Sequence, residues 1–322
     1  MKRVYIAGCG GMLGEAFYQQ FKDTFELKCS DKDVNEPWLS FLDFREVDAY
    51  RRDVLEFNPD YLFHLGACTD LEYCERNPDD AYLTNTLAVE SAVWIANALN
   101  IPLLYISTAG IFDGNKEVYD DWDQPNPLGV YARSKYLGER FVLENALRPL
   151  VCRAGWMMGA GPSKDKKFIQ KIMKQLKDGR TELSIVNDKD GTPTYTQDFA
   201  RNVKVLLKSE LWGLYNMVCG GLTSRFEVAQ ELLSILGLTD SVRLQPVDSS
   251  YFTEYFAPRP ACERLVNRKL DLRSLNRMRD WRVALREYIS AYYDAYLLPE
   301  HREAREFAVV ASATDQPGTR RP

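Results

Sequence analysis

Short apolar runs and longer amphipathic segments alternate along the first half of the chain. The apolar runs are RVYIAG, FELKCS, YLFHLG, PLLYIS and PLVCRA. Segments of helical period lie between them, at residues 12–21, 47–57, 80–99 and 131–143. Strands that are apolar throughout and are separated by helices are typical of a parallel sheet covered on both faces. We therefore expect a doubly wound α/β domain over residues 1–155, with ligands at the carboxyl ends of its strands.

The alternation loosens after about residue 155. A basic segment, SKDKKFIQKIMKQLKDG, is followed by the polar NDKDGTPTYTQD and later by the amphipathic SRFEVAQELLSILG. We interpret residues 156–297 as a smaller α/β domain for substrate binding, with segments near residues 190–220 that return to the sheet. Residues 298–322 lack periodicity and carry many turn-forming and charged residues, so we expect a disordered tail.

Composition and charge narrow the class of protein. The 322 residues are 45% apolar, which is enough to bury a core without crosslinks. The net charge of −5, without a long basic run, gives no electrostatic footprint for nucleic acid or for an anionic membrane. No apolar run approaches the ~20 residues that span a bilayer. We expect a cytoplasmic protein that binds neither nucleic acid nor membrane.

The metal-ligating residue types form no recognisable site. The seven cysteines are scattered, odd in number and never in a C-x-x-C pair, so they suggest neither a disulfide framework nor a zinc site. His64 lies on a buried apolar run, where a hydrogen-bonded core histidine is the simpler interpretation, and the other histidine, His301, is far away in the sequence. We expect buried reduced thiols and no metal.

The first strand ends in a glycine-rich turn, IAGCGGMLG, which opens the first helix. Glycine is needed where the backbone has a positive φ, touches a pyrophosphate or packs closely against a strand. At the first strand of an α/β chain this spacing predicts a dinucleotide site for NAD or NADP. The residues expected to contact the cofactor are Gly8, Gly10, Gly11, Met12, Leu13 and Gly14.

Acidic residues follow the next two apolar stretches. Asp31 ends the second strand, where a carboxylate accepts both ribose hydroxyls of NAD; a turn or cap residue is the alternative. Lys32 could meet a 2′-phosphate, so NADPH stays open. Asp43 could accept from the adenine amino group, or could cap the following helix. By the strand-end rule, Leu65, Gly66 and Ala67 belong to the same cofactor site.

A tyrosine and a lysine lie four residues apart in YARSKYLGER. This spacing places Tyr131 and Lys135 on one face of a helix, one turn apart. A protonated amine beside a phenol favours the phenolate, so Lys135 is expected to lower the pKa of Tyr131 toward a value useful for acid/base work. The strand PLLYIST ends just before this helix in a hydroxyl residue, Thr108.

These features together resemble the extended short-chain dehydrogenase/reductase family over roughly residues 1–295. The resemblance implies a Rossmann-type fold. It further implies that Thr108, Tyr131 and Lys135 form the catalytic triad, with Lys135 also holding the cofactor. Asn85 in LTNTLAVES matches the asparagine that steadies the proton-relay helix of the family, next to the cofactor.

Within that family the chain resembles dTDP-4-dehydrorhamnose reductases and related nucleotide-sugar 4-ketoreductases. The likeness rests on ACTDLEYCERNP, ISTAGIFDG, PNPLGVYARSK, CRAGWMMG, NDKDGTPTYTQDFA and RPACERLVNRKL, in that order. It implies a substrate site that includes Thr69, Thr108, Trp156, Thr192, Pro193, Thr194 and Arg259. Simpler interpretations remain: Trp156 as core, DGTPT as a turn and Arg259 as a surface charge.

The chain also departs from this pattern. Ala109 and Gly110 stand where the family commonly has Asp and Tyr, and Gly129 stands where it commonly has Asn. We expect Ala109 and Gly110 to enlarge the pocket beside Thr108, which puts a rhamnose-type specificity in question while the triad stays intact.

The resemblance implies an NAD(P)H-dependent reductase of a nucleotide-linked 4-keto-6-deoxy sugar, with a dTDP sugar favoured. Two alternatives are compatible with the same residues. One is a nucleotide-sugar epimerase with tightly bound NAD. The other is a non-catalytic, NAD(P)-binding regulatory subunit like the methionine adenosyltransferase β subunit. A homodimer is a further expectation.

Overall fold

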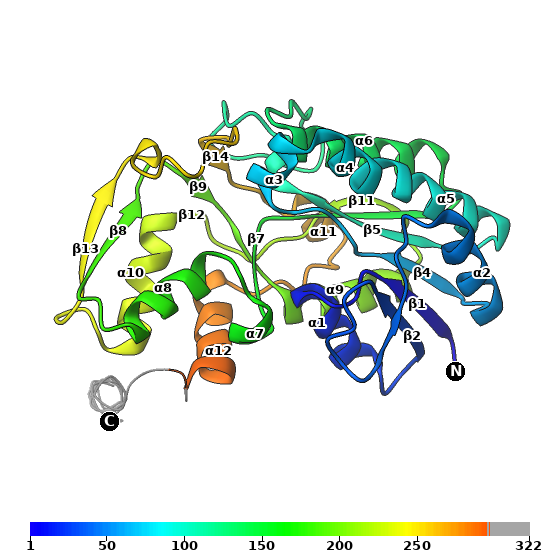
Figure 1. Cartoon of the computed structure of the whole chain (residues 1–322), viewed down its shortest axis with the longest axis horizontal. Coiled ribbons are helices and arrows are strands. Elements are labelled where there is room, and N and C mark those ends of the chain that lie inside the picture. Colours follow the sequence, from blue (N-terminus) through cyan, green and yellow to red (C-terminus); the bar gives the residue numbers. More distant parts are fainter. Residues whose placement is uncertain (295, 297–322) are drawn as a thin grey trace, which may run out of the picture.

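A seven-stranded parallel sheet forms the centre of the molecule (Figure 1). The computed structural model describes residues 1–294 and residue 296, so the expected disordered tail lies outside the described residues. The strand order is β11-β6-β5-β4-β1-β2-β3. The strands are β1 (Arg3–Ala7), β2 (Glu26–Asp31), β3 (Leu39–Phe41), β4 (Tyr61–His64), β5 (Leu103–Thr108), β6 (Pro149–Ala154) and β11 (Gly213–Asn216). The expected doubly wound sheet is confirmed, and its winding reverses between β1 and β4, where such sheets bind ligands.

Helices cover both faces of this sheet (Figure 1). On one face lie α2 (Val47–Phe57), α5 (Ala88–Ala98) and α6 (Val130–Asn145); on the other lie α1 (Met12–Phe21) and α9 (Thr196–Ser209). All four residues of β4 are buried, because strands under two helical layers have no solvent face. The apolar runs seen in the sequence follow from this double covering.

The segment expected as one helix over residues 80–99 is divided. It contains the end of α4 (Pro78–Tyr82) and a π-helical turn η1 (Leu83–Leu87) before α5, and a further short helix, α3 (Leu71–Arg76), precedes it. Apolar periodicity alone does not distinguish a π turn from an α turn. Such turns occur frequently at functional sites, and this one contains the buried Asn85.

The C-terminal part of the chain, residues 156–294, supplies small sheets and helices beside the main sheet. Its strands are β7 (Trp156–Met158), β8 (Glu182–Val186), β9 (Asp190–Gly191), β10 (Pro193–Tyr195), β12 (Thr223–Ser224), β13 (Arg243–Val247) and β14 (Cys262–Glu263). Its other helices are α7 (Gly161–Lys164), α8 (Phe168–Lys177), α10 (Arg225–Leu236), α11 (Arg268–Leu272) and α12 (Trp281–Tyr293), with 3₁₀ turns η2 (Ala109–Ile111) in the first half and η3 (Ser249–Tyr251) here. Between the small strands the chain returns to the main sheet through α9 and β11.

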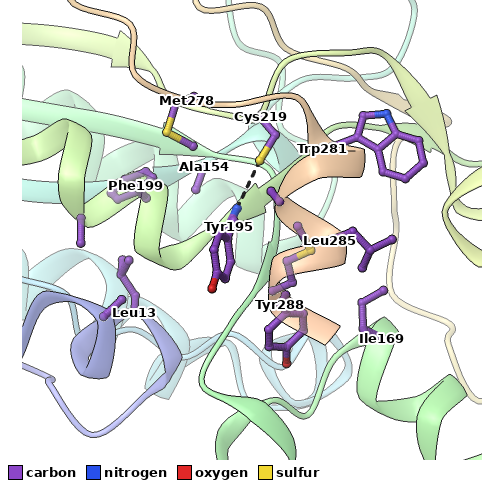
Figure 2. Packing of buried hydrophobic residues seen from close by; sticks show 14 of the residues in the cluster. Leu13, Ala154, Ile169, Tyr195, Phe199, Cys219, Met278, Trp281, Leu285 and Tyr288 are labelled. Atoms are coloured by element: carbon purple, nitrogen blue, oxygen red, sulfur yellow. Dashed lines mark hydrogen bonds between the residues drawn. The ribbon is translucent and has the colours of Figure 1, made fainter. Parts of the chain in front are cut away.

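One apolar core runs through both parts of the molecule. Helix α12 buries Trp281, Leu285 and Tyr288, which share one helix face because their spacing is four and then three residues. Figure 2 shows these side chains along α12, with Tyr195 of β10 between this helix and Phe199 of α9, and the rings of Tyr195 and Tyr288 have centroids 6.0 Å apart. The backbone N–H of Tyr195 donates to Cys219 Sγ at 3.4 Å in the same region. The C-terminal part therefore packs on the sheet through a shared hydrophobic interior.

Candidate active site

The glycine turn joins β1 to α1 and approaches the end of β4. Gly8 has φ +74°, and a Cβ on it would lie 2.3 Å from the Cα of Gly66. A Cβ on Gly14 would lie 2.0 Å from the carbonyl oxygen of Cys9. The fold itself therefore requires glycine at positions 8 and 14, apart from any ligand.

Gly11 is different, because it leaves space that the protein does not fill. A Cβ on Gly11 would meet no atom within 4 Å, and Gly11 is the N-cap of α1 without a side-chain capping bond. The first N–H groups of a helix, with the positive end of its dipole, suit a phosphate. Open space beside an uncapped helix start fits the pyrophosphate of a dinucleotide.

Asp31 lies against this turn. Its Oδ2 accepts from the backbone N–H of Gly10 at 2.8 Å, and its Oδ1 accepts from the N–H of Asp33 at 3.0 Å. Lys32 is exposed beside it. The carboxylate thus stands next to the glycine turn at the end of β2, where a ribose would be recognised.

Asp43 is tied to an arginine. Arg45 Nε donates to the two carboxylate oxygens of Asp43 at 2.9 and 3.0 Å, and Arg45 Nη1 pairs with Asp80 Oδ1 at 2.9 Å. The hydrogen bonds from Arg45 lower the pKa of Asp43. The alternative of a helix cap is wrong, because α2 begins at Val47 with Glu46 as its N-cap. An adenine amino group that donated to Asp43 would do so beside the hydrogen bonds that Arg45 already donates to the same carboxylate.

The residues after β4 complete this edge. The N–H of Leu65 donates to the carbonyl of Ala7 at 2.9 Å, which keeps this chain segment beside β1. The ring of Phe44 packs against Gly66. A Cβ at position 66 would lie 2.0 Å from that ring, so a larger residue would clash there. Ala67 follows in the same loop and is half-buried.

Asn85 connects this loop to helix α6. Its Nδ2 donates to the carbonyl of Cys68 and to Ser134 Oγ, both at 3.0 Å, and its Oδ1 accepts from the N–H of Cys68 at 2.9 Å. Ser134 Oγ in turn donates to the carbonyl of Tyr131 at 2.9 Å. Asn85 therefore fixes the position of the helix that bears Tyr131, as expected.

Thr108 ends β5 and faces the start of α6. Its Oγ1 accepts from the N–H of Gly110 at 3.1 Å. A hydrogen bond with Thr108 lowers the pKa of Tyr131, while burial, the largest effect, and the charge of Glu263 raise it, so that it reaches about 12. Thr108 and Tyr131 therefore meet, as the sequence predicts.

The expected effect of Lys135 on Tyr131 is not found. Burial lowers the pKa of Lys135 itself to about 7, against the opposing charge of Glu139. Burial is the largest effect on Tyr131 and raises its pKa to about 12. The prediction of a lowered Tyr131 pKa is therefore wrong.

The start of helix α6 uses a carboxylate in place of an asparagine. Gly129 is the N-cap, and Glu75 Oε1 accepts from the N–H of Val130 at 2.6 Å. A Cβ on Gly129 would lie 2.6 Å from the same oxygen. Glu75, on α3, thus substitutes for the missing polar side chain at position 129.

The small residues after Thr108 have different environments. Ala109 is buried in an apolar cluster with Ile111 and Phe112, so its methyl group does not border open space as expected. A Cβ on Gly110 would lie 3.2 Å from Glu263 Oε1. The predicted enlargement is therefore wrong at Ala109, because the 3₁₀ turn η2 points it inward, and at Gly110 the space is filled by another residue.

Trp156 is half-buried and firmly held. Its Nε1 donates to Glu263 Oε2 at 2.7 Å. The guanidinium carbon of Arg225 lies 3.7 Å from the centre of its ring, and a Cβ on Gly191 would lie 2.2 Å from the ring. The indole is therefore held by a hydrogen bond at its edge, a cation against its ring and the close approach of Gly191.

Thr192, Pro193 and Thr194 lie beside the strand of Trp156, where Pro193 is paired with Trp156. Thr192 and Thr194 are fully buried, and Pro193 is buried in β10, which pairs with β7. Thr192 Oγ1 accepts from the N–H of Leu265 at 3.1 Å, and Thr194 Oγ1 accepts from the N–H of Gly155 at 2.9 Å. Both hydroxyl groups therefore hold backbone segments next to the strand of Trp156.

Two basic residues of the C-terminal part reach the loop after β4 and helix α3. Arg259 Nη2 pairs with Glu72 Oε1 at 2.7 Å, so it is not a free surface charge. Lys167 Nζ lies 3.3 Å from the carbonyl of Thr69 and 3.4 Å from its Oγ1. These contacts place Thr69 and Arg259 where the two parts of the chain meet.

The sequence analysis missed two residues of this site, Glu263 and Arg225. Glu263 lies inside the RPACERL motif but has no local pattern of its own, and Arg225 begins α10. The available signal for Glu263 was a charged residue on a short strand within a motif already assigned to the site. Among the described residues, no group of three His, Cys, Asp or Glu side chains could hold a metal, and no helix of residues 1–294 is long and apolar enough to cross a bilayer.

Comparisons with known proteins agree with this geometry. The chain is 30% identical over 291 residues to the spore coat polysaccharide biosynthesis protein SpsK of Bacillus subtilis (strain 168), covering 90% of this chain and 97% of SpsK. It is 29% identical over 300 residues to dTDP-4-dehydrorhamnose reductase of Mycobacterium tuberculosis, covering 90% and 93%. A crystal structure of dTDP-4-dehydrorhamnose reductase from Bacillus anthracis in complex with NADP superposes with a TM-score of 0.81 at 28% identity, covering 90% and 100%. The family described as the RmlD substrate binding domain matches residues 1–294, and the chain belongs to this family of extended short-chain dehydrogenase/reductase proteins.

Proposed function

We propose that this protein is an NAD(P)H-dependent reductase of a nucleotide-linked 4-keto-6-deoxy sugar. The observation that carries the proposal is the meeting of Thr108 and Tyr131 at the carboxyl end of β5, one helix turn from Lys135, in a sheet whose strand β1 ends in the glycine turn. A similar solved structure, a dTDP-4-dehydrorhamnose reductase, is a complex with NADP. A similar protein of Mycobacterium tuberculosis is also named dTDP-4-dehydrorhamnose reductase.

The cofactor, when bound, supplies a hydride to the sugar carbonyl. Gly10, Gly11 and the first N–H groups of α1 would hold its pyrophosphate, and Asp31 would accept from the adenosine ribose. Lys135 would hold the second ribose. An acidic Asp31 favours NADH, and the exposed Lys32 beside it supports NADPH, so the proposal includes both cofactors.

Tyr131 would donate the proton. As the carbonyl carbon gains a hydride, its oxygen becomes an alkoxide and takes a proton from the phenol, while Thr108 donates a hydrogen bond to the same oxygen. The raised pKa of Tyr131, about 12, keeps the phenol protonated at neutral pH, which is the state that reduction requires. Burial of the site strengthens both interactions because little water competes for them.

The substrate side would be formed by the junction of the two parts of the chain. Residues 1–155 would bind the cofactor and most of residues 156–294 the sugar nucleotide. Trp156 would border the sugar, and Thr69 and Arg259 would contact the sugar or its nucleotide. A dTDP-linked sugar is favoured by the names of the relatives.

The epimerase and the regulatory subunit are less well supported. An epimerase would use the same Thr108, Tyr131 and Lys135, but the relatives are named as reductases. A regulatory subunit has no need of an intact Thr108 and Tyr131. An epimerase would retain NAD through purification and consume no NAD(P)H. A regulatory subunit would oxidise no cofactor and would alter the kinetics of a partner enzyme.

The test is oxidation of NADH and NADPH by the purified protein with dTDP- and UDP-linked 4-keto-6-deoxy sugars, with the configuration of the product determined by NMR. Tyr131→Phe should lose roughly 10²-fold or more in turnover with nearly unchanged cofactor affinity. If the wild-type protein reduces none of these sugars, or if Tyr131→Phe remains fully active, the proposal is wrong.

We also propose a homodimer in the cytoplasm. Exposed apolar side chains lie on η1, α5 and α6, namely Leu83, Leu87, Trp94 and Leu137. Exposed apolar groups on adjacent helices suit a second copy of the chain. All seven cysteines are free, which fits a reducing compartment. Light scattering of the wild type and of Trp94→Glu would test the dimer.

A further inference from the structure

Glu263 brings a carboxylate to the catalytic residues from a distant part of the sequence. It lies on β14, which pairs in parallel with β9 so that Glu263 is opposite Gly191. Its Oε1 lies 3.2 Å from the position that a Cβ on Gly110 would occupy, and Thr108 Oγ1 lies 3.5 Å from the same position. The carboxylate therefore fills the space that glycine leaves beside Thr108.

The two oxygens of Glu263 have different surroundings. Oε2 accepts from Trp156 Nε1 at 2.7 Å. No donor among the described residues forms a hydrogen bond to Oε1. Arg225 is stacked on the Trp156 ring, with its guanidinium carbon 3.7 Å from the ring centre. One oxygen thus orients the carboxylate, and the other is available to a ligand.

We propose that Glu263 Oε1 is a specificity-determining acceptor that binds the hydroxyl group next to the reacting carbonyl of the sugar. The proposal rests on the proposed function and names its substrate class. When the C4 carbonyl oxygen meets Thr108 and Tyr131, the neighbouring carbons are C3 and C5. In a 6-deoxy sugar C5 carries a methyl group, so the adjacent hydroxyl is the one on C3. The preferred substrates are therefore 4-keto-6-deoxy sugars that retain a C3 hydroxyl.

A charged acceptor is suited to this selection. Hydrogen bonds to charged groups contribute more than those between neutral groups, and a sugar without the hydroxyl would leave a carboxylate oxygen unpaired. The rejected class is therefore the 3-deoxy sugars. Position 110 must stay small for this arrangement, since any larger side chain would meet Oε1.

Glu263→Gln separates recognition from support. The amide keeps the size of the side chain, and its oxygen can still accept from Trp156 Nε1. Its NH₂ group then stands where Oε1 stood, and an acceptor becomes a donor. A residue that only held Trp156 would tolerate this change. Glu144→Gln, an exposed substitution of the same chemistry on α6, is the matched control.

The experiment is calorimetric titration of the NADP⁺-loaded protein with three probes: dTDP, dTDP-6-deoxyglucose and dTDP-3,6-dideoxyglucose. We expect the wild type and Glu144→Gln to bind the 3-hydroxy sugar roughly 10-fold more tightly than the 3-deoxy sugar. In Glu263→Gln this ratio should fall to about one, with dTDP affinity unchanged. An unchanged ratio in the variant, or no preference in the wild type, would overturn the proposal.

Failure of this proposal can be distinguished from failure of the proposed function. Failure of the reductase assignment appears as no oxidation of NADH or NADPH with any 4-keto sugar, whereas the binding ratio is measured without turnover. If dTDP affinity fell together with sugar affinity in Glu263→Gln, the residue would be a support for the whole site and the proposal would be wrong.

Discussion

The side-chain nitrogen of Lys135 lies 4.2 Å from the centre of the Tyr105 ring. The phenol of Tyr105 donates to the backbone carbonyl of Lys135 at 3.0 Å. Tyr105 therefore contacts both the side chain and the backbone of Lys135. Lys135 is buried, and burial lowers its pKa to about 7. The catalytic amine is therefore a source of instability that an aromatic ring only partly offsets.

Lys135→Met should stabilise the protein and abolish its activity. The folded-state pKa of about 7 lies below the usual lysine value of 10.5, so between these values the unfolded chain binds more protons and stability rises with pH. Below pH 7 the destabilisation is complete. At pH 6.5 the variant should gain at least ~1 kcal/mol in the free energy of unfolding, measured with urea.

Lys174→Met, at an exposed position of α8, serves as the control and should change the stability little. The advantage of Lys135→Met should shrink as the pH approaches 10. A variant at position 135 that is less stable than the wild type at pH 6.5 would contradict this account.

Substitution of two glycines of the turn by alanine should affect different properties, stability at Gly8 and cofactor affinity at Gly11. Gly8→Ala should lose more than about 1 kcal/mol of stability, because a left-handed conformation costs a side chain about that much and the methyl would meet Gly66. Gly11→Ala should change stability by less than about 1 kcal/mol. Its methyl would instead occupy the open space at the start of α1 and weaken NAD(P)H binding on the order of 10-fold.

Thermal unfolding and cofactor titration by fluorescence would measure both effects. Normal cofactor affinity in Gly11→Ala would show that the dinucleotide does not approach the backbone at this position.

The buried ion pair behind helix α6 should contribute strongly to stability. Arg153 Nη2 lies 2.6 Å from Glu139 Oε1, and both side chains are at most 3% exposed. Glu139→Gln would leave a buried guanidinium unpaired and should cost about 3 kcal/mol or more. Glu144→Gln removes an exposed pair with Arg140 on the same helix and should cost less than about 1 kcal/mol. If urea denaturation gave equal losses in the free energy of unfolding for the two variants, the buried pair would contribute no more than the exposed one and this prediction would be wrong.

Asp31 should decide the choice of cofactor. Asp31→Ala removes the acceptor for ribose hydroxyls and the repulsion of a 2′-phosphate, while Lys32 remains. The ratio of kcat/KM for NADPH over NADH should rise at least about 10-fold. Steady-state kinetics with both cofactors would measure it, and Asp33→Ala, at an exposed neighbour, is the control. A fall in the ratio would exclude Asp31 from the ribose site.

The local sequence pattern was sufficient to predict those features of the fold and site that depend on residues close together in the sequence. Buried strands under two helical layers produce apolar runs, so the strands from β1 to β6 could be read directly, except the short β3. The glycine turn and the Tyr131–Lys135 spacing are also local, because each depends on one turn of backbone.

Features that depend on contacts between distant residues could not be read in this way. Glu263 reaches Gly110 only through the pairing of β14 with β9. The inward direction of Ala109 follows from a 3₁₀ turn that has no sequence periodicity. The pKa of Tyr131 depends on burial by the whole fold, which outweighs its one predicted neighbour.

Strand β11 joins the sheet beside β6 after the chain has already visited the C-terminal part, and the chain then leaves the sheet again. No single cut point therefore separates a complete nucleotide-binding unit from a complete substrate-binding unit. Recombination that exchanged everything after residue 155 would remove an edge strand and a covering helix, α9, from the sheet. Substitutions within the intact chain avoid this loss, and positions 110 and 263 are one pair of contacting positions at which substrate preference could change.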